Sequence, residues 1–103
     1  MVTRGDVWWY EPPHEQARPH LVLTRNEAIP ILNTVVTVPA TRTIRDIPSQ
    51  VYLDRSDGMP APCALAFDQL RYVEKAYLTR RITTLAAHRW PEVREALTFT
   101  LAC

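Results

Sequence analysis

The sequence predicts a small, mainly β protein that ends in one α-helix and is arranged as a strongly bent sheet or barrel. Short runs of aromatic and β-branched residues, which are typical of strands, recur along most of the chain. Nine prolines and two glycines in 103 residues favour short strands and turns over long helices. Near the C-terminus the apolar spacing changes from two residues to three or four, which indicates a helix.

In the first half of the chain we expect four strands. The aromatic run 6–11 forms the first and stops at Pro12, because proline cannot continue a ladder. The near-continuous β-branched run 33–39 indicates a strand buried on both faces, with Pro39 at a bulge or at the strand end. The other segments are a second strand at 18–24, a linker or single helical turn at 25–32, an exposed polar loop at 40–48 and a fourth strand at 49–53.

The second half begins with a turn at Asp57 and Gly58 and a fifth strand at residues 63–67. Residues 72–75 are expected to continue this strand as a bent extension. A further short strand is expected around Arg81. Five or six strands therefore precede the final segment.

The final segment, residues 90–101, places apolar side chains at helical spacing, among them Trp90, Val93, Leu97 and Leu101. Charged residues lie between them, so the pattern predicts an amphipathic helix packed on the sheet. Pro91 is tolerated there only in the first turn, where backbone N–H groups lack partners.

Length and charge limit the possible classes of protein. At 103 residues we expect one domain, residues 1–103, able to bury a core without staples. The net charge of +1 argues against a basic arm that attracts nucleic acid generally. No apolar run of about 18 residues is present, so we expect no membrane partner. Two isolated cysteines, Cys63 and Cys103, fit free thiols in a reducing cytoplasm.

The second strand carries the residues of greatest chemical interest. Alternation sends Pro19, Leu21 and Leu23 toward a core, and it sends Arg18, His20, Val22 and Thr24 to the opposite face. An arginine at a strand entrance most often forms a surface ion pair, but its planar fork also suits a phosphate. The three His and two Cys residues lack metal-ligand spacing, so no metal is expected.

Four short stretches in order resemble the MazF/PemK toxins of bacterial toxin–antitoxin systems. They are residues 4–9 (RGDVWW), 15–19 (EQARP), 38–41 (VPAT) and 68–71 (DQLR). The resemblance extends from Arg4 to about Leu101. It implies an SH3-like barrel of the MazF/CcdB-type toxin fold that works as a homodimer in the cytoplasm.

The resemblance also implies an activity. Such toxins are sequence-specific endoribonucleases that inhibit growth by cutting single-stranded RNA (mRNA, rRNA or tRNA) without metal or cofactor. The 2′-hydroxyl attacks the adjacent phosphate and leaves a 2′,3′-cyclic phosphate and a 5′-hydroxyl. A cognate MazE-like antitoxin neutralises the enzyme with an extended acidic, hydrophobic tail. Two alternatives remain open: a CcdB-like toxin that poisons DNA gyrase through its C-terminal helix (residues 90–103), and an SH3-like module that only binds.

By position in the motifs, Arg18 and Thr41 are the expected catalytic residues. Arg18 suits stabilisation of the charge on a phosphorane, whereas Thr41 can add one hydrogen bond but cannot act as a base near neutral pH. The resemblance implies substrate-binding roles for Glu15, Gln16, Asn26, Asp68 and Gln69, and position alone adds Arg42 and His20.

The roles of three of these residues have two interpretations each. Glu15 and Asp68 either accept base amino groups or pair with Arg18 or Arg71. His20 either assists proton transfer or is a buried, hydrogen-bonded histidine. The chain also departs from the family in two ways: the loop 12–17 lacks the usual glycines and is short, and His20 replaces a small or aliphatic residue.

Overall fold

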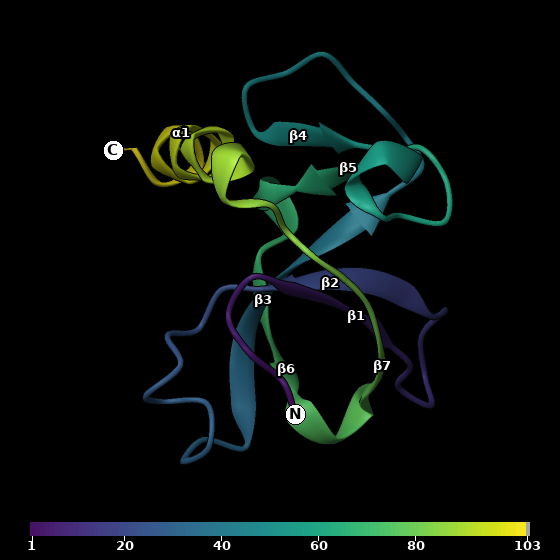
Figure 1. Ribbon diagram of the computed structural model, residues 1–103, viewed down its shortest axis with the longest axis vertical. Helices are drawn as coiled ribbons and strands as arrows, with labels where there is room; N and C mark the ends of the chain where they lie inside the picture. Colours follow the sequence, from purple (N-terminus) through teal and green to yellow (C-terminus); the bar gives the residue numbers. More distant parts are fainter. Residues whose placement is uncertain (103) are drawn as a thin grey trace.

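The computed structural model describes residues 1–102 and confirms a mainly β fold with one C-terminal helix (Figure 1). The elements are β1 Asp6–Tyr10, β2 Arg18–Val22, β3 Thr34–Thr41, β4 Gln50–Leu53, β5 Cys63–Ala66, β6 Arg71–Glu74, β7 Leu78–Thr84 and α1 Trp90–Leu101. Within this part of the chain there are seven strands, not five or six, because the expected extension at 72–75 is an independent strand, β6.

The sheet is antiparallel and runs in the order β4-β5-β3-β2-β1-β7, with β6 also paired to β3. Strand β3 pairs with β6 along Thr34–Thr37 and with β5 at Ala40 and Thr41. This change of neighbour bends the sheet. Figure 1 shows β1, β2, β3, β6 and β7 curling around one core, with β4, β5 and α1 above it. The predicted bent sheet is therefore present.

Two predictions about β3 need correction. Ala40 and Thr41 belong to the strand and not to the exposed loop predicted at 40–48. Pro39, expected at a bulge or strand end, lies inside the strand. It is tolerated there because it lies between the residues that pair with β6 and those that pair with β5.

Both faces of the central strands are buried, as predicted for β3 from its β-branched run, whereas simple alternation missed this for β2. One face packs Val7, Leu21 and Val38 against α1 and the β4–β5 pair. The opposite face closes around a second core. This second core contains Tyr10, Val22, Ile29, Val35, Val73 and Leu78. Val22 and its neighbour His20, expected on the face away from the core, are therefore buried.

The first family motif has a structural role. Gly5 has φ +93°, and a Cβ atom there would lie 3.2 Å from the Trp90 ring at the start of α1. The buried Asp6 carboxylate accepts hydrogen bonds from Thr3, from Trp8 Nε1–H and from the Thr84 hydroxyl. Burial alone raises the pKa of Asp6, but these hydrogen bonds outweigh it and the pKa is lowered. The motif thus ties the N-terminus to β7 and α1.

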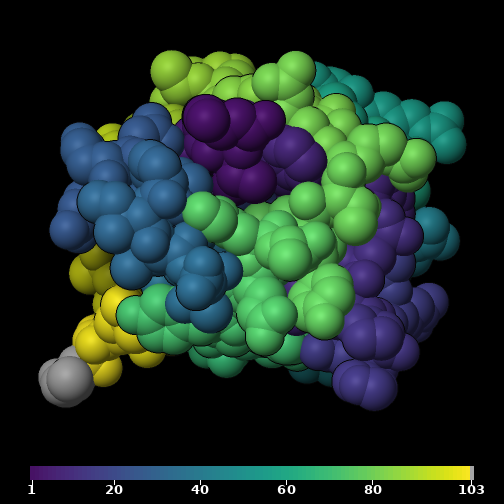
Figure 2. Space-filling view, turned by 90° about the horizontal axis from the view of Figure 1, so that it is seen from below, coloured from purple at the N-terminus to yellow at the C-terminus, as the bar shows by residue number. Residues whose placement is uncertain are grey.

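Figure 2 shows the N-terminal residues lying between the β2–β3 connection (blue) and the green and lime residues near β7. Hydrogen bonds hold this arrangement, from Gly5 N–H to the Val22 carbonyl and from Leu85 N–H to the Gly5 carbonyl. The expected turn at 25–32 is present, with Ala28 and Ile29 N–H both donating to the Arg25 carbonyl.

Helix α1 packs on the sheet as predicted, with Pro91 in its first turn. Val93 and Ala96 are buried, whereas Phe99 and Leu101 are exposed at the far end. No helix in residues 1–102 has both the length and the apolar character needed to cross a bilayer. Cys63 is buried and free, and Cys103 lies outside the described residues.

Candidate active site

Arg18, at the start of β2, and Thr41, at the end of β3, line one hollow. Strands β2 and β3 pair from His20 with Pro39 to Val22 with Thr37. Continuing this antiparallel register by two residues places Arg18 opposite Thr41. The hollow has a volume of about 490 Å³, ample for a nucleotide-sized group. Two residues that are 23 positions apart in the sequence therefore face the same space.

The two side chains are available to a ligand. Arg18 is exposed, and its side chain makes no hydrogen bond or ion pair with any residue from 1 to 102, so the surface ion pair considered for it is not formed. Thr41 Oγ1 accepts a hydrogen bond of 3.1 Å from Thr43 N–H. Because that bond uses an oxygen lone pair, the Thr41 hydroxyl hydrogen can still be donated into the hollow.

The remaining walls of this hollow differ in character. Gln16 and Arg42 line the hollow together with Arg18, as expected from the sequence. Trp9 and residues 59–63 add mainly apolar lining. A lining that combines cationic and apolar side chains suits a ligand that has both a phosphate and a flat base.

A second hollow of about 510 Å³ shares Gln16 and Arg18 with the first. Its other lining residues are Glu15, His20, Pro39, Gln69 and Arg71. Arg18 therefore lies between two adjoining hollows. Together they form a groove at the start of β2 and the end of β3. We call this surface the Arg18 groove, defined by the residues of the two hollows.

Glu15 and Arg71 form a paired contact in this groove. The Arg71 nitrogens Nη1 and Nη2 each donate to one Glu15 oxygen at 2.8 Å. This hydrogen bonding from Arg71, with the positive charges of Arg71 and Arg18 nearby, lowers the pKa of the Glu15 carboxyl. Of the two interpretations of Glu15, the structure therefore contains the ion pair.

His20 lines the same hollow as this pair and is 2% exposed. Its Nδ1 is hydrogen-bonded to Thr37 Oγ1 at 2.8 Å, and its ring lies 4.7 Å from that of Tyr10. Burial, and then the charges of Arg71 and Arg18, lower the pKa of His20 to about 4. The imidazole is neutral at physiological pH, so the structure matches the buried, hydrogen-bonded interpretation of His20.

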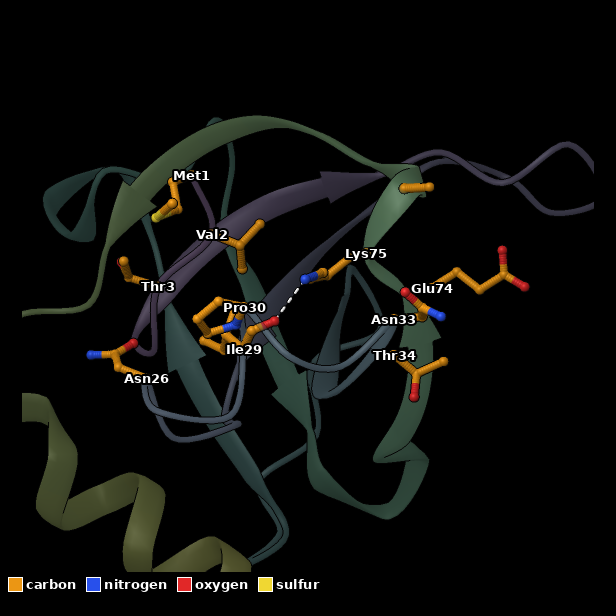
Figure 3. Close-up of a pocket in the computed structure, with 11 residues that line it drawn as sticks. Met1, Val2, Thr3, Asn26, Ile29, Pro30, Asn33, Thr34, Glu74 and Lys75 are labelled. Carbon is orange, nitrogen blue, oxygen red and sulfur yellow. Dashed lines mark hydrogen bonds between the residues drawn. The ribbon is translucent and has the colours of Figure 1, made fainter.

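Two expected residues do not line the Arg18 groove. Asp68 accepts a hydrogen bond of 2.5 Å from the Ser49 hydroxyl, next to Gln69. Asn26 lies in a separate, mainly apolar pocket near Met1 and Lys75 (Figure 3), where its Oδ1 accepts from Arg4 N–H at 2.7 Å. The structure thus does not bring Asn26 together with Arg18 and Thr41.

Sequence reasoning assigned no binding role to one residue that lines the groove. Arg71 was considered only as an ion-pair partner, although it closes the fourth motif. Trp9, in the aromatic run of the first strand, also lines the groove. Within residues 1–102, no three His, Cys, Asp or Glu side chains gather as a metal site.

A bent sheet with a closing helix, and an arginine and a threonine at one groove, agree with the resemblance to the MazF/PemK toxins. The family model described as PemK-like, MazF-like toxin of type II toxin–antitoxin system matches residues 3–101. The chain belongs to this family, as its four motifs predicted.

Individual proteins agree with this assignment. The chain is 38% identical over 104 residues to the probable endoribonuclease MazF5 of Mycobacterium tuberculosis, covering 100% of the chain and 95% of the relative. The M. tuberculosis toxin MazF-mt6 matches with a TM-score of 0.85 at 28% identity, over 92% of this chain and 94% of that one. A mycobacterial endoribonuclease solved with its cognate antitoxin shares the fold, with a TM-score of 0.87 at 24% identity over 98% and 95%. These matches do not support the gyrase-poisoning alternative.

Proposed function

We propose that this chain is a toxin endoribonuclease that cuts single-stranded RNA at short sequences and is neutralised by a cognate MazE-like antitoxin. The observation that carries the proposal is the position of Arg18 and Thr41 in one groove of a MazF-family chain. The relative named as an endoribonuclease supports the choice of activity. A single domain, residues 1–103, acts as a homodimer in this proposal.

The chemistry follows from the two side chains. The 2′-oxygen of RNA attacks the adjacent phosphorus, the bond to the 5′-oxygen breaks, and a 2′,3′-cyclic phosphate and a 5′-hydroxyl result. Negative charge grows on the non-bridging oxygens as the phosphorane forms. The Arg18 guanidinium donates to these oxygens through its fork, and the Thr41 hydroxyl adds one hydrogen bond. Neither role requires a metal or cofactor.

Proton transfer is not assigned to His20. A histidine with a pKa of about 4, held by Thr37 beneath the groove, is a weak base and is neutral when the enzyme works. Its burial against Tyr10 and its hydrogen bond to Thr37 instead support a packing role. Gln16, Gln69 and Arg42 face the groove and are proposed to contact bases and flanking phosphates.

One experiment tests the activity. The purified chain is incubated with a mixed RNA pool in EDTA, and the new ends are mapped and chemically typed. We expect 2′,3′-cyclic phosphate and 5′-hydroxyl ends with the natural chain. The Arg18→Ala variant should lose about 100- to 1,000-fold in rate, since one preorganised donor is removed.

Arg94→Gln is the matched control, because it removes one exposed arginine on α1, outside the Arg18 groove. It should cut RNA at the natural rate. RNA left intact by a folded natural chain would contradict the proposal, and a stalled gyrase in the same preparation would favour the CcdB-like alternative.

A further inference from the structure

Arg71 lies in the groove with its guanidinium already oriented to bind an anion. Its two terminal nitrogens hold both Glu15 oxygens at 2.8 Å, in the parallel arrangement that an arginine also uses for two phosphate oxygens. It lines the same hollow as Arg18, with Gln16 and Gln69 beside it. The Glu15 carboxylate therefore occupies a place that suits a phosphate.

The Tyr10 ring orients the Arg71 guanidinium independently of Glu15. Its central carbon lies 5.5 Å from the centre of the Tyr10 ring, at cation–π distance. Tyr10 is buried and lies against His20, which Thr37 holds by a hydrogen bond. This stack keeps Arg71 in place when Glu15 leaves, so little orientation is lost on exchange of one anion for another.

The Glu15–Arg71 pair is also easy to open. The two side chains are 42% and 44% exposed, and ion pairs between exposed groups are weak. Glu15 lies in the exposed connection between β1 and β2, outside any helix or strand. An RNA phosphate arriving at Arg18 can thus displace the carboxylate without disturbing the sheet.

We propose that Arg71 is a second phosphate-binding residue of the Arg18 groove, and that Glu15 occupies its guanidinium in place of a phosphate until RNA binds. The inference rests on the proposed ribonuclease function and extends it. Glu15 then competes with phosphates for the Arg71 guanidinium, which weakens the binding of the free toxin to polyanions in general. A strand that also satisfies Arg18, Thr41 and the base contacts overcomes this competition.

The test measures binding separately from cleavage. A fluorescent, random-sequence RNA pool with 2′-O-methyl groups cannot be cut, because its 2′-oxygens carry no proton and cannot attack. Affinity for this pool is measured over a salt series with the natural chain and with Arg71→Gln, Arg71→Lys, Glu15→Gln and the Glu15→Gln/Arg71→Gln double variant. Arg94→Gln on α1 is the matched control for the loss of one positive charge. Circular dichroism and thermal melting verify that each variant is folded.

We expect Arg71→Gln to reduce the slope of log affinity against log salt by about 0.7, the value for one lost phosphate contact on a single strand. Arg71→Lys should keep this slope but bind more weakly, since the fork is lost. Glu15→Gln should bind up to about fivefold more tightly, the factor that corresponds to an exposed pair of about 1 kcal/mol. In the double variant the gain from Glu15→Gln should vanish.

Several results would overturn the inference. These are an Arg71→Gln slope equal to that of Arg94→Gln, weaker binding by folded Glu15→Gln, a gain retained in the double variant, or no binding by the natural chain. Cleavage of unmodified RNA is scored separately. If the chain binds the pool through Arg71 but leaves RNA intact, the proposed function fails and the inference stands. If the chain cuts RNA with an unchanged Arg71→Gln slope, only the inference fails.

Discussion

Acid should destabilise this protein through His20, and the size of the effect can be worked out. The pKa of His20 is about 4 in the folded chain and 6.5 in an unfolded one, because burial disfavours the charged ring. Between these values the unfolded state binds a proton that the folded state does not. Stability is therefore full above pH 6.5 and falls as the pH drops toward 4. The gap of about 2.5 pH units corresponds to a loss of about 3 kcal/mol.

The assay is urea unfolding at several pH values from about 7.5 down to 4, at fixed protein concentration because a dimer is proposed. His20→Gln serves as the comparison, since its amide can bond Thr37 but does not titrate. The Asp6 carboxyl, whose pKa is also lowered, acts equally in both proteins and cancels in the difference. The natural chain should lose about 3 kcal/mol more than the variant over this range. Parallel loss in the two proteins would refute the reasoning.

Three further predictions concern single side chains. Thr41→Val should lower the RNA cleavage rate by about 100-fold in single-turnover assays and leave the melting temperature unchanged. A melting temperature that falls together with the rate would contradict a role in the reaction. Gly5→Ala should lower the free energy of unfolding by about 1–2 kcal/mol in urea titrations, because φ +93° is strained for alanine and Trp90 is close; unchanged stability would disprove this. Arg89→Met should lower stability by about 2 kcal/mol, because Arg89 joins Asp57 and the Tyr52 carbonyl to the start of α1, while the cleavage rate per folded molecule stays unchanged. A stable Arg89→Met variant would show that this contact is dispensable.

The sequence was most informative where local chemistry determines structure. The β-branched run before Thr41 and the helical spacing from Trp90 onward produced β3 and α1 nearly as predicted. The motifs also indicated that Arg18 and Thr41 act together, and the structure places both at one hollow. The two residues lie close together because of the register between β2 and β3. A sequence motif predicts that register only through its resemblance to proteins of known fold.

What the sequence did not reveal depends on contacts between distant residues. Alternation in β2 assumed one open face, but β6, β7 and the β2–β3 connection close a second core over it and bury His20. The Glu15–Arg71 pair joins residues 56 positions apart. No local pattern distinguishes it from a pair between Glu15 and Arg18. Asn26 was associated with the site only by the resemblance, and the fold places it in another pocket.

The short connection between β1 and β2 constrains the position of Glu15. Tyr10 at the end of β1 pairs directly with Arg18 at the start of β2, so residues 11–17 must turn within a narrow span. The resemblance implies a longer, glycine-containing loop in relatives, able to cover the groove. Here the connection holds Glu15 against Arg71. Selection of RNA should therefore depend more on the fixed walls, Trp9 and residues 59–63, than on a closing loop.

The same arrangement accounts for a nucleic-acid enzyme with a net charge of only +1. Arg18, Arg42 and Arg71 are concentrated at one groove, so the local field there is strong although the whole chain is nearly neutral. Glu15 offsets part of that field until a substrate displaces it. Because binding then requires several groove contacts at once, near-neutral charge favours selective RNA binding over the general attraction that a basic surface would produce.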